Sequence, residues 1–107
     1  MRYLIRFEAS MEAGGRVDRS PGGAGAAIGR ILELIKPEAF YVSVFKRELS
    51  MIVNSNDPAL LTEAAHVVQL VAGANLEVTP IMTGEEAMTI IPKALGNALA
   101  TAKSLGL

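Results

Sequence analysis

The chain has no cysteine and no tryptophan, and its 107 residues include a single histidine, His66. The lack of cysteine excludes disulfides, thiolate catalysis and cysteine-ligated zinc or iron–sulfur sites, and it fits a cytoplasmic protein. Any imidazole chemistry must use His66, and no cluster of His, Asp and Glu stands around it at metal-ligand spacing. We therefore expect no metal and no other cofactor.

An excess of charge of one sign is also lacking, because ten Lys and Arg residues face eleven Asp and Glu residues. No segment groups basic with aromatic residues, as a nucleic-acid-binding surface would. No apolar run approaches the roughly 18 residues of a membrane span, and Arg2 and Arg6 interrupt the first apolar segment, unlike a signal peptide. We expect neither nucleic acid nor a membrane as a partner.

Half of the residues are hydrophobic, yet only 5% are aromatic, so the apolar content consists mainly of aliphatic side chains and methionine. The length suits one domain over residues 1–107. A small domain this apolar is expected to hide part of its surface in a homodimer or larger homo-oligomer.

Periodicity along the chain predicts an α+β fold. Its order is β-α-β-β-α-β, which is typical of a ferredoxin-like sandwich with an antiparallel sheet and helices on one face. The core is expected over residues 1–82, and residues 83–107 are expected to add a C-terminal helical extension. Strands are predicted over Tyr3 to Ala9, Phe40 to Phe45, Leu49 to Asn54 and Leu76 to Ile81, and helices over Ser20 to Lys36 and Asp57 to Gly73.

Three helix starts carry local signals. Ser20-Pro21 and Asp57-Pro58 each pair an N-cap residue with proline at the first helical position. Thr83 and Glu86 are spaced as a capping box, in which each side chain satisfies a free backbone amide. Pro92 is expected to divide or kink the helix that follows.

The segment from Ser10 to Arg19 shows no periodicity and contains two glycines, so it is predicted to be a mobile loop. The glycine-rich residues 22–29 invite a phosphate-binding interpretation, but Ile28 stands where a dinucleotide fingerprint needs glycine, and the Lys-Ser/Thr pair of a phosphate loop is absent. Close packing of a smooth helix face, or fraying, is favoured over an anion site.

The candidate site lies on the sheet face that the two core helices would leave open. Arg6 and Glu8 of the first strand are expected beside Glu77 of the last strand, with Tyr41 on the outer second strand. Arg6 could hold an anionic ligand, while Glu8, Glu77 or Tyr41 acts as acid or base. In the alternative interpretation, Arg6 pairs with a neighbouring carboxylate across the strands or across a dimer interface.

Four segments between about Leu34 and Ala87 carry a resemblance to known proteins, and they are Lys36 to Tyr41, Asn56 to Pro58, Glu77 to Thr83 and Glu85-Glu86. Together they resemble small uncharacterised bacterial proteins of the dimeric α+β barrel superfamily. That resemblance implies that two ferredoxin-like sheets face each other, and similar members include muconolactone isomerases and cofactor-free monooxygenases. The monooxygenases often use His, Trp or Asn on the sheet, whereas this chain has no tryptophan and no strand histidine.

Three functions follow as hypotheses. The favoured one is an oligomeric domain that binds a small anionic organic molecule on its sheet face, with Arg6 as the anchor. The second is a cofactor-free isomerase or monooxygenase-like enzyme that uses the same face. The third is a structural or regulatory interaction subunit whose amphipathic tail, from Lys93 onward, binds another protein.

Overall fold

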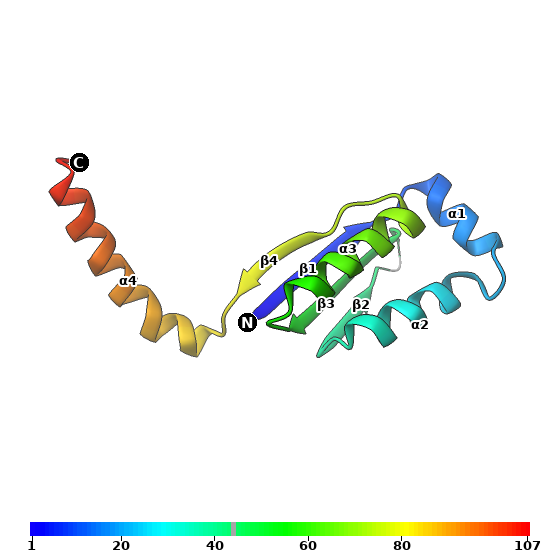
Figure 1. The fold of residues 1–107 in the computed structure, drawn as a ribbon, viewed down its shortest axis with the longest axis horizontal. Helices are drawn as coiled ribbons and strands as arrows, with labels where there is room; N and C mark the ends of the chain where they lie inside the picture. Colours follow the sequence, from blue (N-terminus) through cyan, green and yellow to red (C-terminus); the bar gives the residue numbers. More distant parts are fainter. Residues whose placement is uncertain (44) are drawn as a thin grey trace.

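The computed structural model describes residues 1–43 and 45–107. Within them the chain forms a four-stranded antiparallel sheet and four helices, which confirms the predicted α+β class (Figure 1). The second predicted strand is shorter than expected, and Val44, which was included in it, lies outside the described residues. The strands are β1 (Arg2–Glu8), β2 (Ala39–Val42), β3 (Glu48–Asn54) and β4 (Glu77–Ile81), and the helices are α1 (Met11–Arg19), α2 (Gly23–Ile35), α3 (Pro58–Ala72) and α4 (Gly84–Ser104).

The strands lie in the order β2-β3-β1-β4, and each neighbouring pair is antiparallel. Strand β1 is central, and its Ile5 lies opposite Met51 of β3 and Val78 of β4. Because successive side chains point to opposite faces, Ile5 is buried and Arg6 is exposed. This arrangement is compatible with a ferredoxin-like fold.

Helices α2 and α3 pack on one face of the sheet and enclose the core. Ile5 and Met51 have no exposed surface, and each fully buried aliphatic side chain contributes about 1.5–3 kcal/mol by leaving water. Helix α2 contributes apolar side chains to this core, since Ile31 and Ile35 are buried. The core consists of Ile5, Phe7, Ile31, Ile35, Leu49, Met51, Val53, Ala64, Val68 and Ala72.

The predicted loop from Ser10 to Arg19 is wrong, because residues Met11 to Arg19 form helix α1. The Ser10 hydroxyl oxygen accepts a hydrogen bond from the backbone N–H of Ala13 at 3.0 Å and caps the helix. Helix α1 packs against α2 and α3, with Ala13 buried beside the end of α3 and Gly14 buried beside the Arg47 side chain. Tertiary packing therefore stabilises a helix that its own periodicity did not reveal.

The predicted helix start at Ser20 is also wrong, because Ser20 is the C-cap of α1. Its backbone N–H and its hydroxyl both donate to the carbonyl of Val17. The chain then turns through Gly22 (φ 80°) and Gly23 (φ 61°), and α2 begins without a side-chain cap. Both glycines adopt the left-handed conformation that other residues rarely tolerate.

Helix α3 follows its sequence signals closely. The Asp57 carboxylate accepts hydrogen bonds from the amides of Ala59 and Leu60, at 3.0 and 3.3 Å, and Pro58 occupies the first turn. Gly73 ends the helix in a left-handed C-cap (φ 61°). These caps fix where α3 begins and ends against the sheet.

Helix α4 projects away from the rest of the molecule (Figure 1). It is continuous through Pro92, so of the two predicted effects of this proline the division is wrong and the kink stays a prediction, and none of its residues is buried. The molecule measures 60 × 29 × 26 Å and has a radius of gyration of 18.2 Å, against about 13 Å for a compact chain of this length. No helix in the described part of the chain is both long enough and apolar enough to span a bilayer.

Candidate functional site

The sheet face opposite α2 and α3, here called the open face, carries the residues that alternate with the core. One row across the strands is largely apolar, and the next row is polar. The apolar row runs Ala39, Ile52, Leu4 and Thr79, and the polar row runs Tyr41, Ser50, Arg6 and Glu77.

Arg6 is engaged by Glu48, the first residue of β3. The Arg6 Nε–H donates to Glu48 Oε1 at 3.0 Å, and Nη2 bonds to the same oxygen. This hydrogen bond, together with the positive charge of Arg6, holds the pKa of Glu48 below its usual range although partial burial opposes the shift. Arg6 thus pairs with a carboxylate of the neighbouring strand, as the alternative interpretation expected. The role of Arg6 as a ligand anchor stays a prediction.

Three carboxylates surround Arg6 at one end of the open face. Glu8 lies directly opposite Glu48 in the register, and Glu77 lies opposite Arg6 on the other side. The hydrogen bond to Glu48 is the main cause that raises the pKa of Arg6, and the charges of all three carboxylates add to it. Sequence reasoning missed Glu48 because it placed that residue in the turn before β3.

Tyr41 lies two strands away from Arg6 and is 65% exposed. The predicted candidates thus share one face, but Tyr41 does not join the carboxylate group. At the opposite end of β1, the Arg2 Nε–H donates to Glu38 at 3.0 Å, and an Arg2 amino group lies 3.9 Å from Glu86 of α4. The first turn of α4 is therefore held at the sheet edge.

A groove of about 670 Å³, here called the α1–α2 groove, reaches Glu8 and Glu48 at one end of the open face. It runs between α1, α2, the end of α3 and the turn that joins β2 to β3. Most of its lining is aliphatic or aromatic, and no single segment of the sequence supplies it. Its apolar residues include Met11, Val17, Ala27, Ile28, Phe45 and Leu49.

The rim of the α1–α2 groove is charged. Arg47 spans the groove wall, pairs with Asp18 at 2.8 Å and accepts a hydrogen bond on its carbonyl from the Ala9 amide at 2.8 Å. The Arg47 side chain can cross α1 at Gly14 because glycine has no side chain, whereas a Cβ at that position would overlap Arg47. Lys46 also lines the groove, and Glu8 contributes from the end of β1.

The predicted smooth face of α2 meets no neighbour in this single chain. A Cβ added at Gly25 or Gly29 would have no heavy atom of the described residues within 4 Å beyond its own surroundings in the helix. Gly22, the third glycine of that predicted face, stands before the helix in the turn. The packing expected to compensate for these glycines is therefore not found among the described residues.

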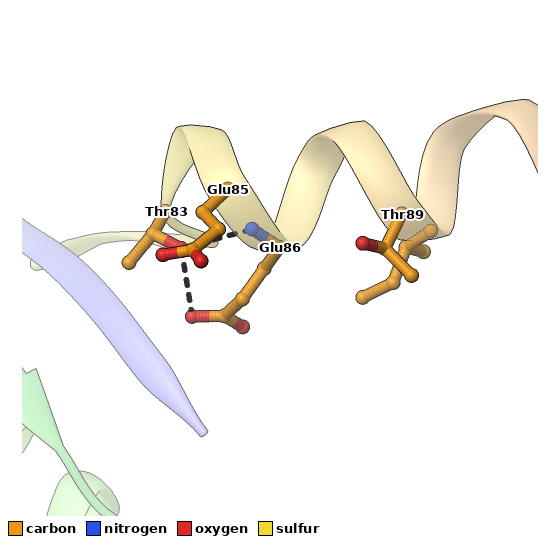
Figure 2. A pocket seen from close by; sticks show the side chains of 5 residues that line it. Thr83, Glu85, Glu86 and Thr89 are labelled. Atoms are coloured by element: carbon orange, nitrogen blue, oxygen red, sulfur yellow. Dashed lines mark hydrogen bonds between the residues drawn. The ribbon is translucent and has the colours of Figure 1, made fainter.

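A second hollow, of about 480 Å³, is lined by residues at the start of α4, around the cap of that helix. Figure 2 shows Thr83 joined to Glu86 in two ways. The Thr83 hydroxyl oxygen accepts from the Glu86 amide at 3.1 Å, and the hydroxyl donates to the Glu86 carboxylate at 3.1 Å. The predicted capping box is thus realised with a side-chain contact in place of the second amide contact.

His66 lies on the exposed side of α3, with its Nδ1 2.8 Å from the carbonyl oxygen of Thr62. Among the described residues, no group of three His, Cys, Asp or Glu side chains could hold a metal ion. No protein-family model and no curated protein sequence matches the chain. The proposals below therefore depend on the geometry of the site alone.

Proposed function

We propose that the chain is a ferredoxin-like domain that binds a small organic molecule in the α1–α2 groove. The ligand has an apolar body and one acidic group. The observation that carries this proposal is the groove itself, because about 670 Å³ falls within the range of about 300–1,000 Å³ typical of small-molecule sites.

The lining supports each part of that ligand. The aliphatic and aromatic side chains would cover the apolar body and gain free energy by excluding water. Lys46 on the rim supplies an ammonium group for the acidic end, whereas Arg47 is already paired with Asp18. A ligand with a single acidic group matches this rim better than a polyanion, because Glu8 and Asp18 also line the groove.

The open face is less suited to an anion. A ligand on Arg6 would have to replace Glu48, and it would then face the charges of Glu8 and Glu77. The hypothesis that Arg6 anchors the ligand remains a competing prediction, which the titration below separates from the groove.

The enzyme hypothesis has less support than binding. Of its three candidate acid/base residues, only Glu8 lines the groove, while Tyr41 and Glu77 do not. We therefore propose binding without assigning a reaction. A cytoplasmic location stays a prediction that depends on the lack of cysteine.

The test is a fluorescence titration with 1-anilinonaphthalene-8-sulfonate, whose fused rings and single sulfonate match the proposed ligand class. Ala27→Phe fills the groove and is expected to weaken binding at least about tenfold, the loss of roughly 1.4 kcal/mol of affinity. Ala26→Phe is the matched control, because Ala26 is the exposed neighbour of Ala27 on α2 and does not line the groove.

Charge variants complete the titration. Lys46→Ala is expected to weaken binding of the sulfonate, and Lys93→Ala on α4 is expected to leave it unchanged. Equal binding by the two phenylalanine variants would contradict a site in the groove. A loss confined to Arg6→Ala would instead place the anion on the open face.

A further inference from the structure

We propose that two copies of the chain form a symmetric homodimer in which α4 of each copy lies on the open face of the other. This proposal is independent of the ligand in the α1–α2 groove. It follows from two apolar surfaces that a single copy leaves uncovered, the stripe of α4 and the apolar row of the open face.

The stripe of α4 is long and broad. At 100° per residue, its apolar side chains span an arc of about 120° around the helix. None of them is buried, and Leu95 and Leu99 are 55% and 62% exposed. The stripe consists of Ala87, Met88, Ile91, Leu95, Ala98, Leu99, Ala102 and Leu105.

The width of the stripe favours a sheet over a second helix as its partner. Two-stranded coiled coils use a narrow seam flanked by charged residues. On α4, the positions that would flank such a seam are apolar or small instead of charged, as Ala87, Ala94 and Leu99 show. Such a helix needs a wide, flat partner surface, and the open face offers one.

The open face presents apolar side chains in its middle. Leu4 and Ile52 lie side by side in one row, half-buried, and Ile81 of the edge strand lies in the next row, opposite Arg2. In this structure α2 and α3 cover the opposite face, and α4 leaves the sheet at its edge (Figure 1). No second layer therefore covers the apolar row of the open face among the described residues.

Charges orient the partner helix. The first turn of α4 carries Glu85 and Glu86, and its last turn carries Lys103. The open face has Arg2 at one end and its group of carboxylates around Arg6 at the other. Arg2 already pairs with Glu38 of its own chain, so the orientation rests on the other end: a partner helix that starts at the Arg2 end places its lysine toward the carboxylates.

The same geometry explains why the occupant is a second copy rather than the chain's own helix. Only Met82 and Thr83 separate β4 from α4. The Thr83 cap fixes where α4 begins, Glu86 lies 3.9 Å from Arg2 of β1, and from there the helix projects away from the rest of the molecule (Figure 1). A second copy related by a two-fold axis can bind the helix on its open face without any change in how α4 begins.

The area is sufficient for a stable dimer. A helix of 21 residues is about 31 Å long and covers a strip about 10 Å wide. Two reciprocal strips remove on the order of 1,200 Å² from water, which reaches the range of specific interfaces. A contact between the two α4 helices alone would remove about half as much and would leave both open faces uncovered.

Disulfide trapping tests the arrangement, and the native chain contains no cysteine to interfere. Ile91 lies about 10 Å along α4, and Leu4 lies about 7 Å along the open face from Arg2, so the two positions should meet. Chains carrying Ile91→Cys, marked by a mass tag, are mixed with chains carrying Leu4→Cys and oxidised. The expected product is a covalent dimer of one tagged and one untagged chain.

Two matched variants keep the test decisive. Thr89→Cys lies on the polar side of α4 and is expected to give at least about tenfold less mixed dimer than Ile91→Cys. Thr79→Cys shares the row of Leu4 on the exposed edge strand and replaces Leu4→Cys if that variant does not fold. Circular dichroism confirms the fold of each chain before mixing.

Each competing arrangement gives a different product and would overturn the proposal. Cross-linking of Ile91→Cys chains only to each other would indicate a helix pair, and of Leu4→Cys chains only to each other would indicate facing sheets. A chain carrying both substitutions that closes on itself as a monomer would indicate that α4 folds onto its own sheet. Absence of any mixed dimer, with both chains folded, would also contradict it.

Discussion

At the scale of single residues, the pair formed by Arg6 and Glu48 dominates the open face. Because the hydrogen bond from Arg6 lowers the pKa of Glu48, the pair stabilises the fold fully above the ordinary glutamate pKa of about 4.3. That stability is lost as the pH falls through the lowered pKa of Glu48. The interaction is partly solvated, so its contribution is modest.

A carboxyl NMR titration tests this pair. We expect Arg6→Ala to raise the pKa of Glu48, because the hydrogen bond and the positive charge are both removed while the partial burial remains. Glu38 is the internal control, since its pKa is lowered mainly by its hydrogen bond to Arg2 and should stay low in the variant. An unchanged Glu48 titration would show that the pair does not persist in solution.

Gly14 and Gly15 offer a second comparison at the same scale. Replacing glycine by alanine inside a helix usually stabilises it by about 1 kcal/mol. Gly15→Ala is expected to show most of this gain, because its new Cβ would meet only the mobile end of Arg19, 3.3 Å away. Gly14→Ala must displace Arg47 and disturb its pair with Asp18, so it should be less stable than Gly15→Ala.

Chemical denaturation of both variants measures the difference. We expect Gly14→Ala to lie about 1 kcal/mol below Gly15→Ala in unfolding free energy. Equal stabilisation by the two substitutions would mean that Arg47 does not cross α1 at Gly14.

At the scale of secondary structure, the two capped helices should respond differently to loss of their caps. Asp57→Ala removes two hydrogen bonds from α3, which packs on the core, and should lower the global unfolding free energy by about 1 kcal/mol. Thr83→Ala removes the cap of α4, which contributes nothing to the core of its own chain.

Hydrogen exchange separates these effects. Thr83→Ala should reduce amide protection in α4 by about tenfold and leave the protection of β1 and β3 unchanged at low protein concentration. Asp57→Ala should reduce protection throughout the domain. A global loss in the Thr83 variant under these conditions would contradict the independence of α4.

Capping signals in the sequence predicted the helices whose ends are fixed by interactions between neighbouring residues. Asp57, Pro58 and Gly73 fix α3 through caps, and the signal of Thr83 and Glu86 likewise marked the start of α4. Helix α1 was missed because its stability comes from tertiary packing, with Ala13 buried beside the end of α3 and Gly14 beside the Arg47 side chain. Its one local signal, the hydroxyl of Ser10, stood before two glycines that suggested a loop.

At the scale of the whole molecule, the strand alternation placed Arg6, Glu8 and Glu77 on one face, as expected. The partner of Arg6 was missed because Glu48 was expected in the turn before β3, whereas it is the first residue of that strand. The α1–α2 groove was missed because its walls come from helices and a turn far apart in the sequence. Such surfaces depend on tertiary contacts that periodicity does not encode.

The central claim is that one copy of this chain leaves surfaces that only a second copy covers. Sedimentation equilibrium at micromolar protein concentrations tests it most directly. We predict a mass of twice the 11.3 kDa of one chain, and a shift toward 11.3 kDa when Leu95 and Leu99 are both replaced by serine. A mass of 11.3 kDa for the unaltered protein at every concentration would contradict the account.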